Sequence, residues 1–114
     1  MTTAGAALGA GVYAYMQEEF KASEHIPIET AWEASQKSLN KLGFHTLKKE
    51  IRALSRKIIA QSADQEPVII RLEEQTAQVT TFRIRVGTLG NEDVETLIYE
   101  HIKQSISNSP TEKL

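Results

Sequence analysis

The sequence predicts an α+β fold, a two-layer sandwich in which an antiparallel sheet of about five strands carries two helices on one face. Two observations predict it. Segments with apolar residues at every second position lie between two segments with helical periodicity, which gives the order β-α-β-β-β-β-α. The strand segments also have one apolar and one polar side, which is typical of an antiparallel sheet with one face in water.

The N-terminal region differs from the rest of the chain, because residues 2–16 include no charged side chain. Gly5, Gly9 and Gly11 make residues 1–11 poor in intrinsic structure, so we expect a flexible tether there. Its apolar run is shorter than the roughly 20 residues of a membrane-spanning helix, and it lacks the basic start of a signal peptide. Residues 12–23 then alternate between apolar and polar, with Glu18 as the exception, which predicts the first strand.

Residues 28–42 are predicted to form the first helix. Pro27 lies where a helix can begin, because its missing N–H is not needed there, and Gly43 is a typical stop. The apolar residues, Trp32 among them, fall on one stripe, which is expected to face the core.

Four strands are expected next, at residues 44–50, 56–62, 68–73 and 78–86. Asn91 is predicted to cap the last helix, which has an apolar stripe from Val94 to Ile106. Residues 108–114 are polar and are expected to be a frayed tail. A single domain at residues 12–107 follows from these elements.

Composition limits the function. The chain has 114 residues, which suits one small domain, and no cysteine, which excludes a disulfide scaffold, a thiolate zinc site and a cysteine nucleophile. Its 13 basic and 15 acidic residues give a formal net charge of −2, whereas nucleic-acid binders usually show a basic excess.

No catalytic, metal-binding or cofactor-binding residues are predicted. His25, His45 and His101 have no helical i, i+4 spacing, and the adjacent carboxylates all fall where a strand, turn or helix start explains them. An enzyme that uses His101 or His45 with a nearby carboxylate is the least favoured of the hypotheses.

One turn has the position of an anion-binding loop. Gly87, Thr88 and Gly90 follow a strand and precede a helix, so backbone N–H groups there can face an anion. The turn lacks the Lys-Ser/Thr ending of the nucleotide-binding motifs. We favour the simpler interpretation, a tight turn that needs glycine dihedral angles.

Basic residues concentrate in the middle of the sequence and on the polar side of the later strands. The candidate interaction surface comprises Lys48, Lys49, Arg56, Arg71, Arg83 and Arg85. Such a surface suits anionic lipid, polysaccharide or an acidic partner. The favoured alternative is a solvated sheet face with cross-strand ion pairs, such as Arg83 with Glu73.

Several short motifs occur in order along the chain: Gly9-Ala10-Gly11, Tyr13-Ala14-Tyr15, Ala31-Trp32, Leu42-Gly43-Phe44 and residues 84–91, Ile-Arg-Val-Gly-Thr-Leu-Gly-Asn. In these, residues from about Gly5 to Ile106 resemble an uncharacterised bacterial family of small, secreted, lipoprotein-like proteins, a domain-of-unknown-function family. The resemblance implies an upstream signal peptide with a lipidated cysteine, and no known activity or catalytic residue. The chain departs from the family at Glu18-Glu19-Phe20, at Arg52-Ala53, and in having no such cysteine.

We therefore expect a non-enzymatic domain of the cell envelope, the soluble part of a lipoprotein-like protein, that binds another envelope component. With the upstream lipidated cysteine it would be anchored in the periplasm or outer envelope; otherwise it would be cytoplasmic. The alternative is a small-ligand-binding domain with a pocket between sheet and helices. No nucleic-acid or cofactor partner is expected, and self-association through Tyr13, Tyr15 or a strand edge is an open alternative.

Overall fold

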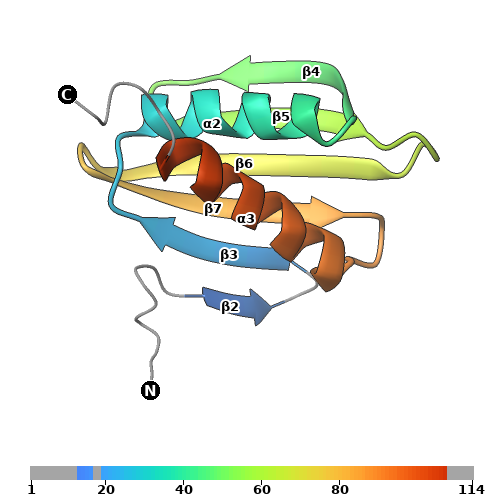
Figure 1. The fold of residues 1–114 in the computed structure, drawn as a ribbon. Helices are drawn as coiled ribbons and strands as arrows, with labels where there is room; N and C mark the ends of the chain where they lie inside the picture. Colours follow the sequence, from blue (N-terminus) through green and yellow to red (C-terminus); the bar gives the residue numbers. More distant parts are fainter. Residues whose placement is uncertain (1–12, 17–18, 108–114) are drawn as a thin grey trace.

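Two helices cover one face of a single sheet in the computed structural model (Figure 1). The structure describes residues 13–16 and 19–107. The elements in chain order are β2 (Tyr13–Met16), β3 (Glu19–Glu24), α2 (Ile28–Lys41), β4 (His45–Ile51), β5 (Ser55–Gln61), β6 (Pro67–Thr76), β7 (Val79–Val86) and α3 (Glu92–Ser107). The expected tether, the expected tail and the Gly9-Ala10-Gly11 motif lie outside the described residues.

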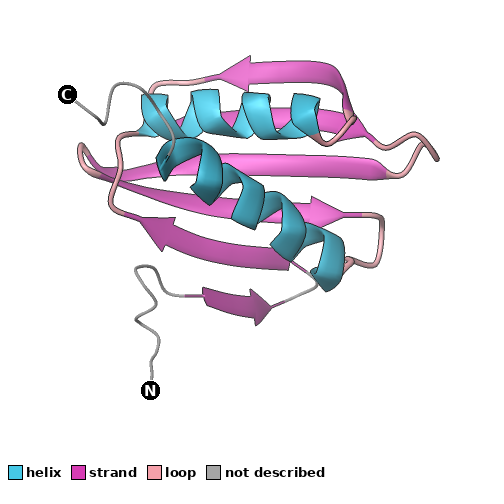
Figure 2. Cartoon of the chain, in the orientation of Figure 1, coloured by secondary structure: helices cyan, strands magenta, loops and turns pink. Residues whose placement is uncertain are grey.

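The sheet has the strand order β2-β3-β7-β6-β5-β4, and every neighbouring pair is antiparallel. Helix α2 carries the chain from β3 to the edge strand β4, and the strands then return as a meander until β7 pairs with β3. Helix α3 lies beside α2 on the same face, so the molecule has two layers (Figure 2). The predicted α+β sandwich and its element order are confirmed.

The first predicted strand is the main difference. Residues 12–23 do not form one strand: β2 and β3 are two antiparallel strands, with Tyr13 opposite Ala22 and Met16 opposite Glu19. Paired residues share a face of the sheet, and each pair here joins an odd-numbered residue to an even-numbered one. The alternation that predicts a single strand therefore does not continue from β2 into β3. Glu18, the one exception in the pattern, lies between the two strands. The sheet therefore has six strands.

The other boundaries lie within one residue of the prediction, except the end of β6. That strand continues to Thr76, because Glu74 still pairs with Thr80 and Thr76 with Val79 after a register shift. The polar residues there suggest a turn, but they belong to the hairpin. Within the described residues, neither helix is long and apolar enough to cross a membrane.

The core lies between the sheet and the helices. Residues that pair across the sheet line up in rows on this face; one row consists of Ile58, Ile70, Ile84 and Phe20, each no more than 2% exposed. Trp32, at 8% exposure, packs into the same core from α2, as its helical stripe predicts. Burial of this apolar surface is the main stabilising contribution to the fold.

Helix α3 is rotated relative to the predicted stripe. Leu97 is 46% exposed, whereas Glu95 and Tyr99 are buried together with Ile98 and Ile102. The Tyr99 ring explains the rotation, because its centroid lies 4.8 Å from that of Phe20 and 5.6 Å from that of Phe82. Aromatic pairs at such distances contribute beyond the area that they bury.

Candidate functional site

Among the described residues, no second layer covers the sheet face that points away from the helices, and we call it the open face (Figure 2). Neighbouring residues of a strand point to opposite faces, and paired residues share a face. Because Ile58, Ile70 and Ile84 face the helices, the residues next to them face outward. The described charged residues of the open face are Glu19, Lys21, Lys48, Glu50, Lys57, Arg71, Glu73, Arg83 and Arg85.

Four basic side chains form one line across the open face, which we call the basic row: Lys21, Arg83, Arg71 and Lys57. The register places Lys21 opposite Arg83, Arg83 opposite Arg71, and Arg71 opposite Lys57. Adjacent strands are about 4.8 Å apart, and like charges directly opposite one another destabilise a sheet. The register alone would make this row repulsive, unless acidic side chains lie beside it.

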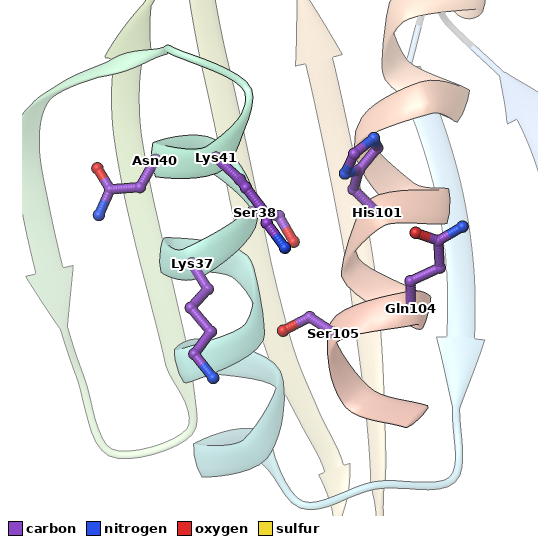
Figure 3. Close-up of a pocket in the computed structure, with 7 residues that line it drawn as sticks. All are labelled: Lys37, Ser38, Asn40, Lys41, His101, Gln104 and Ser105. Atoms are coloured by element: carbon purple, nitrogen blue, oxygen red, sulfur yellow. The ribbon is translucent and has the colours of Figure 1, made fainter. Parts of the chain in front are cut away.

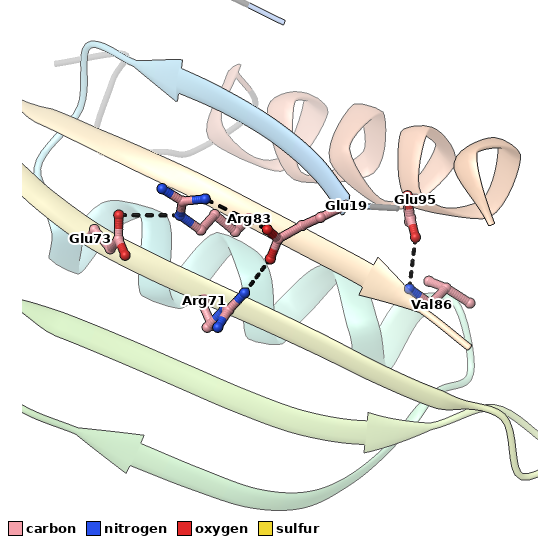
Figure 4. A network of polar contacts seen from close by, with 6 residues as sticks. All are labelled: Glu19, Arg71, Glu73, Arg83, Val86 and Glu95. Atoms are coloured by element: carbon pink, nitrogen blue, oxygen red, sulfur yellow. Dashed lines mark hydrogen bonds and ion pairs between the residues drawn. The ribbon is translucent and has the colours of Figure 1, made fainter. Parts of the chain in front are cut away.

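Two glutamates beside the basic row compensate its two arginines (Figure 4). The Arg71 guanidinium donates to Oε2 of Glu19, and Arg83 Nη1 lies 3.6 Å from Glu19 Oε1. Arg83 Nε also donates to Oε1 of Glu73 over 3.3 Å. No carboxylate of the described residues lies within 4.0 Å of Lys21 or Lys57. The two arginines are thus held in place, whereas Lys21 has no ion pair among the described residues and Lys57 lies opposite Glu50 in the register, beyond ion-pair distance.

The open face and the rest of the molecule differ in charge. Six basic and three acidic side chains of the described residues lie on the open face, an excess of three positive charges. The whole chain has a formal charge of −2, so the described part of the open face is opposite in sign to the chain as a whole. This separation supports long-range attraction of an acidic surface toward the open face.

The structure brings together four of the six residues of the predicted interaction surface: Lys48, Arg71, Arg83 and Arg85. Lys49 pairs with buried Ile58 and Arg56 with buried Leu72, so both belong to the helix side. Arg56 is bound there, because its Nη2 donates to Oε2 of Glu29 on α2 over 2.6 Å.

Lys48, Lys49 and Arg56 are close together in the sequence, which predicts one basic cluster. Neighbouring residues of a strand point to opposite faces, so the structure places Lys48 on the open face and the other two on the helix side. The same alternation could have found two residues that the predicted surface omits, Lys21 and Glu19, because both lie on the polar side of the first predicted strand.

The predicted anion-binding turn is filled by the chain's own groups. Gly87 and Gly90 have φ of 78° and 84°, as a glycine turn requires. Glu95 Oε2 accepts hydrogen bonds from the backbone N–H of Val86 over 2.8 Å and of Asn91 over 3.0 Å, and its side chain is fully buried (Figure 4). The Thr88 carbonyl accepts from Arg85. Binding of an external anion at this turn stays a prediction.

A second carboxylate, which is partly buried, lies on the helix side. The Tyr99 hydroxyl donates to Oε2 of Glu24, at the end of β3, and Lys103 Nζ lies 4.0 Å from the same oxygen. Burial raises the pKa of the Glu24 carboxyl above its ordinary value of 4.5, and the charge of Lys103 opposes that rise.

A cavity of about 540 Å³ lies between the two helices (Figure 3). Its lining comprises Lys37, Ser38, Asn40, Lys41, His101, Gln104 and Ser105. The expected pocket between sheet and helices is not where this cavity lies, because apolar side chains fill that layer. We call this cavity the helix cleft.

The histidines do not converge. His25 and His45 are exposed, and His101 lies in the helix cleft, whose lining includes no carboxylate. Among the described residues there is no group of three His, Cys, Asp or Glu side chains that could hold a metal ion.

Fold and surfaces together define a small α+β domain with one covered sheet face and one open, charged sheet face. The family model described as "Protein of unknown function (DUF3568)" matches residues 2–105, and the chain belongs to this family. The match agrees with the resemblance inferred from the motifs, as far as a domain-of-unknown-function family. No curated protein matches the sequence.

Proposed function

We propose that this chain is a non-enzymatic domain of a bacterial cell-envelope protein that binds an acidic protein surface of the envelope through its open face. The observation that carries the proposal is the basic row. Its two arginines are paired with glutamates of the same face, and its two lysines are the cations that the carboxylates of a partner can meet.

The pattern of charges favours a protein partner over a uniform anionic surface. Three glutamates interrupt the basic residues of the open face, and Glu50 also lies within 3.4 Å of Lys48 Nζ. A lipid surface would attract the lysines but repel these carboxylates, whereas a protein can place opposite charges against both. Electrostatic complementarity of this kind selects partners and speeds their association.

The proposal includes an anchor at the N-terminal side of the domain, in accordance with the motifs of the resembled family. The native reading frame tests this part. A frame that extends upstream of Met1 into a signal peptide and a cysteine would support the anchor. A frame that begins at Met1 would remove the anchor from the proposal and leave the open face to be tested by itself.

The non-enzymatic part rests on the arrangement of titratable groups. General acid–base catalysis needs a donor and an acceptor within reach of one substrate. The two arginines of the basic row are already bound to Glu19 and Glu73, and His101 shares its cavity with no carboxylate.

Site-specific photocrosslinking in the native bacterium tests the open face. A photoreactive residue at Ile69, in the centre of the open face, should give an adduct with one acidic envelope protein. The matched control is Leu97, which is also apolar and is 46% exposed on α3. Adducts of equal yield at both positions, or none at position 69, would contradict the proposal. Cosedimentation with anionic lipid vesicles, with no protein adduct, would replace the protein partner by a lipid one.

A further inference from the structure

The helix cleft is a second surface with a chemical character of its own, and it lies on the layer opposite the open face (Figure 3). The C-terminal half of α2 supplies Lys37, Ser38, Asn40 and Lys41, and the second half of α3 supplies His101, Gln104 and Ser105. All seven side chains contain hydrogen-bonding groups, and their lining includes no carboxylate. At about 540 Å³ the cleft is within the size range of small-molecule sites.

The helix cleft is lined by two lysines, of which Lys37 follows Glu33 on α2 by four residues, a favourable spacing for opposite charges. Lys37 and Lys41 are one helical turn apart, and like charges at this spacing destabilise a helix. Neither lysine has a carboxylate within 4.0 Å among the described residues, in contrast to Lys48 and Lys103. The dipole of α2 accounts for Lys41, in the last turn, but Lys37 lies a turn further from the helix end.

A buried hydroxyl points to a ligand independently of the charge. Ser38 is 2% exposed, lines the helix cleft, and its Oγ has no hydrogen-bond partner. An unpaired buried hydroxyl is unfavourable, and an acceptor atom in the cleft would pair it. The Ser38 and Ser105 hydroxyls both point into the space between the helices (Figure 3).

We infer that the helix cleft binds a small molecule with a phosphate group. A phosphate monoester carries close to two negative charges at pH 7 and has three acceptor oxygens. Two lysines balance this charge, and the Ser38 and Ser105 hydroxyls donate to the oxygens. The inference does not depend on the proposed function, because the two surfaces share no residue.

NMR titration of the whole chain with inorganic phosphate and glycerol 3-phosphate tests the inference, with sodium chloride added to hold the ionic strength constant. We expect saturable, one-to-one amide shifts that are localised to Ser38, Lys41, Gln104 and Ser105. Acetate should not reproduce them. Shifts that rise linearly without saturation, or that acetate matches, would overturn the inference.

Two variants with equal loss of charge provide the decisive comparison. Lys37→Gln with Lys41→Gln should weaken phosphate binding about tenfold or more, because both lysine charges of the cleft are removed. Lys21→Gln with Lys57→Gln, on the open face, should leave it unchanged. If both double variants weakened phosphate binding equally, the anion would be attracted by lysine charges in general and not bound in the helix cleft. The inference would then be wrong.

Ser38→Ala separates a binding role from a structural one. The substitution removes a hydroxyl without a partner, and alanine is the better helix former, so Tm should stay or rise. Phosphate affinity should nevertheless fall several-fold. A lowered Tm with unchanged affinity would show that the hydroxyl serves the packing of α2 and would contradict its role in the site.

Discussion

The two faces of the sheet are built from neighbouring residues of the same strands, yet they differ in almost every physical property. The helix side presents the row Ile58, Ile70, Ile84 and Phe20, all buried. One residue away, the open face presents the basic row, with four cations in line across the same strands. The first row stabilises the fold by burial, whereas the second consists of charged side chains that glutamates of the same face compensate in part. The proposed binding role of the open face would account for a charged row that adds little to stability.

The largest expected effect is a difference in the free energy of unfolding between isoleucine-to-alanine substitutions on the two faces. Ile70→Ala removes a fully buried side chain and should lower the free energy of unfolding by about 2–5 kcal/mol. Ile69→Ala, at the adjacent outward position, should lower it by under about 1 kcal/mol, because that side chain is already in partial contact with water. Urea unfolding measures both. A similar loss for the two variants would show that a partner layer or self-association covers the open face.

The second prediction concerns the buried carboxylate that supports the turn before α3. Glu95→Ala leaves the N–H groups of Val86 and Asn91 without their acceptor and should lower the free energy of unfolding by about 2–4 kcal/mol. Glu95→Gln keeps an acceptor oxygen and should lower it by less. Thermal unfolding of both variants provides the test. If Glu95→Ala were neutral, an external anion would have to replace the carboxylate, and the anion-binding interpretation of the turn would gain support.

A smaller effect on the free energy of unfolding is expected at Glu19, the carboxylate that contacts both arginines of the basic row. Glu19→Gln removes the carboxylate that Arg71 and Arg83 share and leaves the two guanidinium groups opposite each other. The free energy of unfolding should fall by about 1 kcal/mol at low ionic strength. The loss should shrink in 1 M salt, where charges are screened over about 3 Å. Glu33→Gln, exposed on α2, is the control with the same change in charge. A loss that does not depend on salt would mean that Glu19 acts through packing.

The smallest effect is a dependence on pH at Glu24. Burial raises the pKa of this carboxyl above 4.5 in the folded protein, so the folded state holds the proton more tightly than the unfolded state does. The resulting contribution to stability is complete below pH 4.5 and is lost as the pH rises through the folded pKa.

Glu24→Gln should remove this part of the pH dependence and keep an oxygen that accepts from the Tyr99 hydroxyl. Unfolding of the wild type and the variant between pH 4 and pH 8 checks the sign. Relative to the variant, the wild type should lose stability as the pH rises above 4.5. A relative gain would contradict the burial of the Glu24 carboxyl.

Most of the fold could be predicted from the sequence, because periodicity reports the buried side of each element. Trp32 on α2 and the cap at Asn91, whose Oδ1 accepts from the Val94 N–H over 3.3 Å, were both found in this way. The hairpin of β2 and β3 was not, because the alternation changes phase between the two strands and no apolar or glycine signal marks the change. Pairing between distant segments, which places β7 beside β3, leaves no trace in local periodicity.

The candidate site was predictable only in part. Arg71 and Arg83 were assigned to the outward face correctly by alternation. Arg56 was grouped with them by nearness in the sequence, although its strand position turns it toward Glu29. The helix cleft could not be predicted, since it depends on how two helices meet. Its lysines carry no sequence signal beyond a like-charge pair.

The central claim is that the open face serves binding and not folding. The most direct test is the crosslink yield from position 69 in the wild type and in the variant Lys21→Gln with Lys57→Gln, together with the unfolding free energy of each. We predict a large loss of adduct with unchanged or slightly higher stability, because two cations leave a repulsive row. An unchanged adduct yield, or a stability loss that accounts for the lost adduct, would contradict the claim.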